Sequence, residues 1–113
     1  MKIYSILLTL EVDSSYEFDE GSMMSRFLVV IESQFDVKNT VHHIFANGAF
    51  TYAIILAESH AVIQTYPELN KIFISLEYHE ENEKCKVIKD AKLVSDLKEA
   101  LGGSIVGYEK LER

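Results

Sequence analysis

The chain has 113 residues and a hydrophobic content of 48%, which is enough for one domain with one core and too little for two. Its 18 acidic and 11 basic residues give a net charge of −7, which argues against a nucleic-acid polymer as partner, because phosphate binding requires clustered Lys and Arg. A cationic small molecule suits this charge better. We therefore expect residues 1–113 to form a single domain that binds a small molecule.

The apolar stretch near the start, IYSILLTL, has only eight residues and is followed by acids. It is too short for a membrane span and wrongly flanked for a signal peptide. The single Cys85 has no partner for an internal disulfide, which favours a reducing compartment. We expect a cytoplasmic protein without a membrane partner.

The first half of the chain predicts two strands and a helix. Residues 2–11 are rich in Ile, Leu, Tyr and Thr, as in a strand. Asp19 is a plausible helix N-cap, and apolar residues then recur at helical spacing: Met24, Phe27, Leu28, Ile31 and Phe35. Residues 38–45 predict a second strand, and residues 46–48 a turn.

The second half predicts four more strands and a second helix. Residues 52–57 are apolar on both faces, which predicts a central strand covered on each side, and residues 61–66 predict the next strand. Residues 71–79 alternate, so their polar face is expected to line a pocket. A charged loop over 80–84 precedes a helix that Gly102 and Gly103 close, with apolar positions at Val87, Ala91, Val94, Leu97 and Leu101. Residues 104–108 complete the pattern as a strand.

This order of elements favours an α+β two-layer sandwich, with a mainly antiparallel sheet and two helices on one face, because each apolar face is then buried once. Glu58, Ser59 and His60 fall between two apolar strands. Polar groups on a short connection of a rigid scaffold are typical of a functional site. The alternative is an ordinary polar hairpin turn.

The run AESHAVIQTYPE, residues 57–68, resembles the motif of the prokaryotic S-adenosylmethionine decarboxylase proenzymes, in which E-S-H is followed after three residues by H-T-W-P-E. In that family the serine is the point of self-cleavage and becomes the pyruvoyl group. Ser59 matches this serine, Glu58 the residue before it, and Tyr66 replaces the tryptophan. The resemblance extends loosely over nearly the whole chain and implies the same fold and a homo-oligomer.

The resemblance also implies a set of substrate-binding residues. Glu68 matches the glutamate that holds the ribose hydroxyls, and Phe45 the aromatic residue that stacks on adenine. Thr51 takes the place of a hydroxyl residue that assists processing, and Tyr66 offers an aromatic face to the sulfonium. The alternatives are an exposed glutamate after a proline, an ordinary core phenylalanine and a strand threonine.

Two chemical groups of the family are replaced. Gln64 stands where the family has the histidine base that completes pyruvoyl formation, and glutamine can hold a ligand but cannot take a proton. His79 stands near the place of the cysteine that donates a proton, which a histidine could also do. We therefore expect an uncut chain that has no pyruvoyl cofactor and no metal. The predicted catalytic residues are Glu58, Ser59, Gln64 and His79.

We consider three hypotheses for the function, each from a different class of protein. The first is a lyase that acts on S-adenosylmethionine or the adenylated derivative SAM-AMP without pyruvoyl, giving methylthioadenosine, or its adenylated form, and homoserine lactone. Small lyases of this type occur in phages and beside type III CRISPR systems, and the chain resembles them in size and expected substrate. The alternatives are a pyruvoyl-dependent decarboxylase of polyamine synthesis, with pyruvoyl from Ser59 and with His79 or His60 in the missing roles, and a non-catalytic SAM-binding regulatory subunit.

Overall fold

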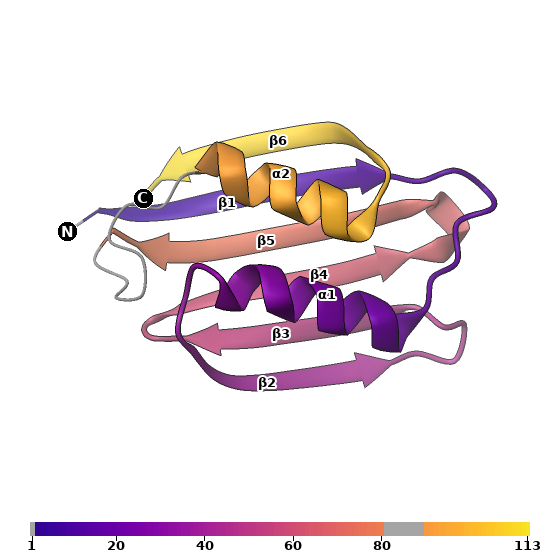
Figure 1. Cartoon of the computed structure of the whole chain (residues 1–113), viewed down its shortest axis with the longest axis horizontal. Helices are drawn as coiled ribbons and strands as arrows, with labels where there is room; N and C mark the ends of the chain where they lie inside the picture. The colour runs from indigo at the N-terminus through magenta and orange to yellow at the C-terminus, as the bar shows by residue number, and fades with distance from the viewer. Residues whose placement is uncertain (1, 81–89) are drawn as a thin grey trace.

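Six strands pair in one antiparallel sheet, and two helices lie on one of its faces (Figure 1). The structure is a computed structural model that describes residues 2–80 and 90–113. The elements follow in the order β1 (Ile3–Glu11), α1 (Glu20–Glu32), β2 (Val37–Ile44), β3 (Phe50–Leu56), β4 (Ser59–Tyr66), the 3-10 helix η1 (Pro67–Leu69), β5 (Lys71–His79), α2 (Asp90–Leu101) and β6 (Ser104–Glu112). The predicted α+β two-layer sandwich is confirmed.

The first strand of the chain lies inside the sheet rather than at its edge. The strand order is β2-β3-β4-β5-β1-β6, so β1 pairs with β5 on one side and with β6 on the other. Leu8, for example, lies opposite Ile74 of β5 and Tyr108 of β6. The edges are therefore β2 and β6 among the strands that the structure describes.

The core lies between the sheet and the two helices. Successive side chains of a strand point to opposite faces, so every second residue of β3, β4 and β5 is buried beneath the helices, as are Ile6, Leu8 and Leu10 of β1. Helix α1 begins at Asp19, whose carboxylate accepts a hydrogen bond from the backbone nitrogen of Ser22 at 3.1 Å. The fully buried methionine of this helix is Met23, whereas the predicted Met24 is only partly buried.

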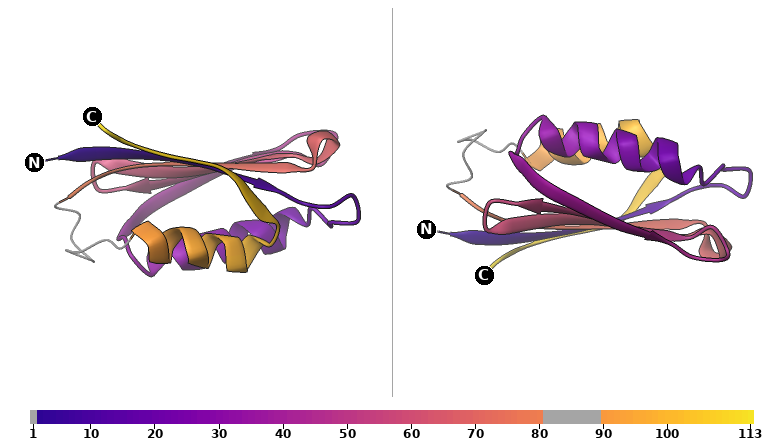
Figure 2. Two further views of the ribbon diagram at one scale, coloured as in Figure 1. Left: turned by 90° about the horizontal axis from the view of Figure 1, so that it is seen from above. Right: turned by 90° about the horizontal axis from the view of Figure 1, so that it is seen from below.

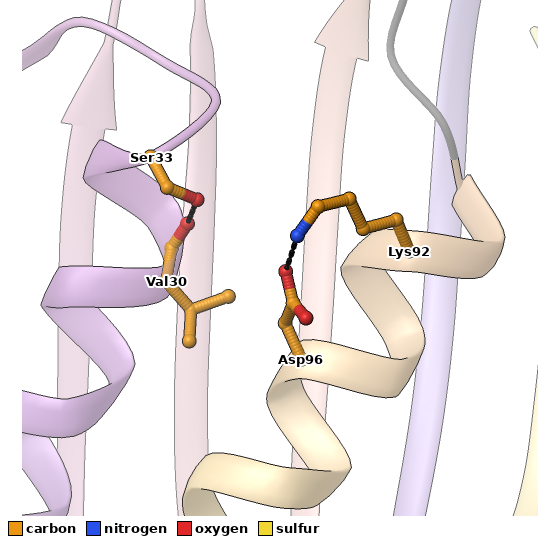
Figure 3. A network of polar contacts seen from close by, with 4 residues as sticks. All are labelled: Val30, Ser33, Lys92 and Asp96. Atoms are coloured by element: carbon orange, nitrogen blue, oxygen red, sulfur yellow. Dashed lines mark hydrogen bonds and ion pairs between the residues drawn. The ribbon is translucent and has the colours of Figure 1, made fainter.

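The two helices lie side by side on the sheet, as the two views of Figure 2 show. Arg26 of α1 donates to the carbonyl oxygen of Ala100 in α2 at 2.8 Å. Figure 3 shows two contacts within the layer: the Ser33 hydroxyl donates to the Val30 carbonyl, and Lys92 pairs with Asp96 one turn along α2 at 2.6 Å. Such an i,i+4 pair contributes only about 0.2–0.5 kcal/mol to helix stability. The position of the helix layer therefore depends mainly on the packing of its apolar side chains against the sheet.

The other face of the sheet, which we name the open face, is not covered by either helix (Figure 2). The prediction that residues 52–57 are covered on both sides is therefore wrong: β3 buries Tyr52, Ile54 and Leu56, but leaves Ile55 42% exposed. Large apolar side chains that the strand register places on the open face are between 38% and 61% exposed: Ile3, Leu7, Val41, Ile55, Phe73 and Leu111. A sheet face of this composition is suited to a partner or a ligand.

Several predicted boundaries move. β4 begins at Ser59 rather than at residue 61, so Ser59 and His60 belong to the strand and not to the connection. β6 continues beyond residue 108 to Glu112. Phe45 lies just outside β2 and is 45% exposed, so it is not a core residue. Cys85, Val87 and the predicted charged loop after Glu80 lie outside the described residues.

Two of the three glycines with positive φ give a test of how α2 is joined to β6. Gly103, at φ +85°, has the backbone oxygen of Glu11 only 2.7 Å from where a Cβ would stand, whereas Gly48, at φ +86°, has open space there. Gly48→Ala should lower the free energy of unfolding by about 1–2 kcal/mol through backbone strain alone. Gly103→Ala should cost about 1–3 kcal/mol more, because β1 or β6 must also shift. Urea denaturation of both variants measures the difference, and equal losses would contradict the close approach.

Candidate functional site

The connection between β3 and β4 is a two-residue turn, Ala57-Glu58, closed by the pairing of Leu56 with Ser59. Glu58 has φ +53°, a left-handed conformation that costs a residue with a Cβ about 1–2 kcal/mol. Ser59 is the first residue of β4 and points to the helix side, where it is only 7% exposed. Ser59 therefore lies within the paired sheet beside a strained turn residue, and it is not displayed at the surface.

His79, at the end of β5, approaches this turn. Its Nε2 lies 4.0 Å from the Glu58 carboxylate, and the two side chains differ in exposure, at 12% for His79 and 83% for Glu58. Glu58 and His79 thus approach each other at one end of the sheet, whereas Ser59, the next residue in the chain, points to the helix side and His79 lies on the open face.

The substrate-binding residues implied by the motif gather at the other end of the sheet. Glu68 stands exposed on η1, and its carboxylate accepts a hydrogen bond at 3.3 Å from the side-chain amide of Asn47, in the turn between β2 and β3. The same Asn47 side chain accepts from the backbone nitrogen of Ala49 at 3.0 Å, so the turn itself fixes the amide. Phe45 begins this turn and stacks edge-on against His43, with ring centroids 4.8 Å apart.

Gln64 is held at both ends of its side-chain amide. The Thr51 hydroxyl of β3 donates to its Oε1, and its Nε2 donates to the carbonyl oxygen of Thr65 at 3.0 Å. Thr51 and Gln64 are direct neighbours across the two strands and lie on the open face. A glutamine fixed in this way presents a positioned dipole without a titratable group. Thr65 of the motif has a structural role, since its buried hydroxyl accepts from the backbone nitrogen of Phe50 at 3.0 Å.

The structure does not bring all the predicted site residues together. Ser59 and Gln64 are five residues apart on one strand, which is about 16 Å along β4. An odd separation also places them on opposite faces, Ser59 toward the helices and Gln64 on the open face. The predicted site residues are therefore divided into a turn cluster at one end of the sheet (Glu58 and His79, with Ser59 on the helix side) and a ligand cluster at the other end (Phe45, Thr51, Gln64, Tyr66 and Glu68).

Two adjoining hollows lie on the open face above β5, and they share Leu7 and Ser75 in their walls. One, of about 290 Å³, reaches Gln64 and Phe73, and the Phe73 ring stands edge-on to Tyr66 with centroids 5.1 Å apart. The other, of about 220 Å³, is lined by polar side chains that include Ser5, His60 and Glu77. The predicted pocket on the polar face of residues 71–79 therefore exists, but sequence reasoning missed Ser5 and Arg113, which come from strands remote in the chain.

A second polar cluster anchors the start of α2 on the helix side of the sheet. The Tyr78 hydroxyl donates to the Asp90 carboxylate at 2.8 Å, and Lys110 of β6 pairs with the same carboxylate. Burial, followed by the Asp90 hydrogen bond, raises the pKa of Tyr78 above its usual range, so the phenol stays protonated. Lys110 also lies over the Tyr4 ring, 4.3 Å from its centroid. These contacts connect β1, β5 and β6 to the start of α2, so the cluster has a structural role.

The fold defines a class of α+β proteins in which two helices cover one face of a six-stranded antiparallel sheet. A crystal structure of the adenosylmethionine decarboxylase from Aquifex aeolicus VF5 has the same fold, with a TM-score of 0.73 over 99% of this chain and 88% of that chain at 15% sequence identity. The sequence profile of the S-adenosylmethionine decarboxylase family matches residues 22–113. The chain therefore belongs to the S-adenosylmethionine decarboxylase family. A comparison with curated protein sequences gives no significant match.

The family implies a pyruvoyl group, and the residues present do not fit its formation. Ser59 is buried in a paired strand. Gln64 itself carries no group that could remove a proton, and Thr51 and Thr65 hold its amide in place. Among the described residues no helix is long and apolar enough to cross a membrane, and no group of three or more His, Cys, Asp or Glu side chains is arranged to hold a metal.

Proposed function

We propose that this protein is a lyase that cleaves the carbon–sulfur bond of S-adenosylmethionine, or of its adenylated derivative, without a pyruvoyl group. The observation that carries the proposal is Gln64, fixed by Thr51 on the open face in the place of the family's base, while Glu68 keeps its carboxylate oriented by Asn47. The ligand-holding part of the motif is retained, and its proton-transfer part is replaced.

The proposed reaction requires no proton transfer. An oxygen of the ligand's own carboxylate attacks its γ-carbon and forms the ester bond of the lactone. The bond between that carbon and the sulfonium breaks, and its electron pair stays on the sulfur. The products are neutral methylthioadenosine and homoserine lactone, which keeps the ammonium charge. The protein has only to fold the tail into reach, and such positioning can be worth about 7–11 kcal/mol in ideal cases.

The residues of the ligand cluster supply the positioning. Glu68 is placed to accept the ribose hydroxyls, because a carboxylate takes two hydroxyl hydrogens in charge-assisted bonds. The Tyr66 and Phe73 rings, 5.1 Å apart, offer faces to adenine or to the sulfonium. Gln64 orients the tail through its fixed amide. In this scheme His79 and Glu58, which were predicted to be catalytic, do not contact the reacting atoms.

We also infer that a second copy of the chain covers the open face. Exposed Leu7, Ile55, Phe73 and neighbouring apolar side chains lie on a face that no described helix covers. A second copy carries the same bare face, so one two-fold contact removes both from water. The hollows above β5 would then lie between two sheets, where water is excluded from the ligand.

The first prediction is that the chain stays intact. Intact-mass spectrometry of the purified protein should give one species of about 12.9 kDa, because Gln64 cannot complete the cleavage at Ser59. Two fragments, residues 1–58 and 59–113, would contradict the loss of processing and would favour the decarboxylase instead.

The second prediction concerns Glu68 and the reaction itself. Incubation with S-adenosylmethionine, and in parallel with SAM-AMP, should release the corresponding methylthioadenosine product; carbon dioxide would instead indicate a decarboxylase, and an unchanged but bound ligand a regulatory binder.

Glu68→Gln keeps the shape of the side chain and removes its charge, which costs about 1.5–3 kcal/mol, or roughly a 10- to 100-fold loss of affinity in calorimetry. Glu99→Gln, on the exposed surface of α2, is the matched control and should bind normally. Equal affinities of the two variants would remove Glu68 from the site.

The third prediction concerns the second copy. Ile55→Glu places a charge on the open face and should convert a dimer into a monomer in analytical ultracentrifugation, because the charge would be buried without a partner. Val29→Glu is the control, since Val29 is 67% exposed on α1, on the other side of the molecule. Thermal melts check that both variants fold. A monomeric parent, or the same behaviour in both variants, would contradict the proposed contact.

A further inference from the structure

The smaller hollow on the open face contains an ion pair that the proposed chemistry has not used. The Arg113 guanidinium lies 3.7 Å from the Glu77 carboxylate and 3.3 Å from the Ser5 hydroxyl. Ser5 in turn donates to Glu77 at 3.1 Å. The backbone nitrogen of Arg113 donates to the carbonyl oxygen of Ile3 at 2.7 Å, so the position of Arg113 is fixed by the β1–β6 ladder.

The register of the sheet explains why these side chains meet. His60, Glu77, Ser5 and Leu111 form one row across β4, β5, β1 and β6, and all four point to the open face. Strands that are remote in sequence thereby contribute a carboxylate, a hydroxyl and an imidazole to one hollow of about 220 Å³, and Arg113 adds a guanidinium. The carboxylate and guanidinium remain 37% and 58% exposed, so both are open to a ligand.

A carboxylate beside a guanidinium is the complement of an α-amino acid zwitterion. The ligand's ammonium group can pair with the carboxylate while its carboxylate pairs with the guanidinium, and both new pairs are charge-assisted. A half-exposed ion pair contributes little to folding stability, so opening it toward a ligand costs little. Neither the 3-10 helix nor the turn cluster offers such an adjacent pair among the described residues.

The hollow lies along β5 from the ring pair of the ligand cluster. Glu77 and Phe73 lie four residues apart on the same face of β5, a separation of about 13 Å. The adjoining hollow, which shares Leu7 and Ser75, leads along this line to Gln64 and to the Tyr66–Phe73 ring pair. An adenosyl group near those rings would direct its methionine tail toward Glu77 and Arg113.

We propose that the hollow between β4, β5 and β1 binds the α-amino acid end of the ligand, with Glu77 holding the ammonium and Arg113 the carboxylate. This inference rests on the proposed function and adds the residues that recognise the reacting tail. A guanidinium bound to one carboxylate oxygen leaves the other free to reach the γ-carbon. Glu77 fixes the α-carbon through the ammonium, so the tail is held from both of its charged groups.

The test uses three adenosyl probes. One keeps both charged groups of the amino acid end and cannot be cleaved, and the other two lack one or both of these groups. Sinefungin keeps the amino acid end and carries an amine in place of the sulfonium, so it cannot be cleaved. Decarboxylated S-adenosylmethionine keeps the ammonium and lacks the carboxylate. Methylthioadenosine lacks both. Calorimetric titration of each probe into the parent, Arg113→Gln and Glu77→Gln separates the two contacts.

Arg113→Gln should weaken sinefungin by roughly 10- to 100-fold and leave the other two probes unchanged. Glu77→Gln should weaken sinefungin and decarboxylated S-adenosylmethionine and leave methylthioadenosine unchanged. Lys92→Gln and Glu99→Gln, on the exposed side of α2, are the charge-matched controls and should bind all three probes as the parent does.

The outcomes distinguish this inference from the proposed function. If Arg113→Gln binds sinefungin as tightly as the parent, the amino acid end lies elsewhere, while binding of methylthioadenosine and cleavage of S-adenosylmethionine by the parent would leave the lyase standing. If either variant weakens methylthioadenosine equally, its effect is on the fold or on the adenosyl part, and the assignment is wrong. A parent that binds none of the probes would overturn the proposed function and the inference with it.

Discussion

The period of two along β4 is the constraint on which the site depends. A sheet with helices on one face only has one buried side and one open side, and each residue of a strand is committed to one of them. Ser59 falls on the buried side and Gln64 on the open side. The two positions that the motif joins in sequence therefore work in different environments: one belongs to a hydrogen-bonded core, and the other to the surface where a ligand can lie. Any chemistry of this chain that uses Gln64 must take place on the open face.

The fold was largely predictable because its signals are periodic. The alternation over residues 71–79 and the paired glycines after Leu101 each have a local physical cause, and both predictions agree with the structure. The helical spacing from Met24 predicts α1, although the helix ends at Glu32, before Phe35. The failures have a shared cause. The apolar run over residues 52–57 is compatible with burial on both faces, and only the placement of both helices on one side reveals that Ile55 is exposed. Sequence near a strand cannot report how many layers cover it.

The site was predictable only where it is local. Glu68, Gln64 and Thr51 follow from the resemblance, and their roles stay predictions; the structure shows that Thr51 and Gln64 are in contact and that Asn47 contacts Glu68. Asn47 was expected only to turn the chain, yet it also orients the Glu68 carboxylate. Ser5 and Arg113 lie at opposite ends of the sequence and meet through the pairing of β1 with β6, for which no short motif exists. Contacts of this kind depend on topology, which a single sequence specifies only through the whole fold.

The central place of β1 has a consequence for how the chain folds. β1 pairs Tyr4 with Glu112, so one of its two ladders joins residues more than a hundred positions apart. Closing so long a loop carries a large entropic cost, and folds with many such contacts form slowly. During synthesis an early-made apolar strand with Ile6, Leu8 and Leu10 waits for residues 71–79 and then for residues 104–112 before both of its edges are paired. Until then its backbone hydrogen-bonding groups and apolar side chains are unpaired, which is the condition in which such segments aggregate.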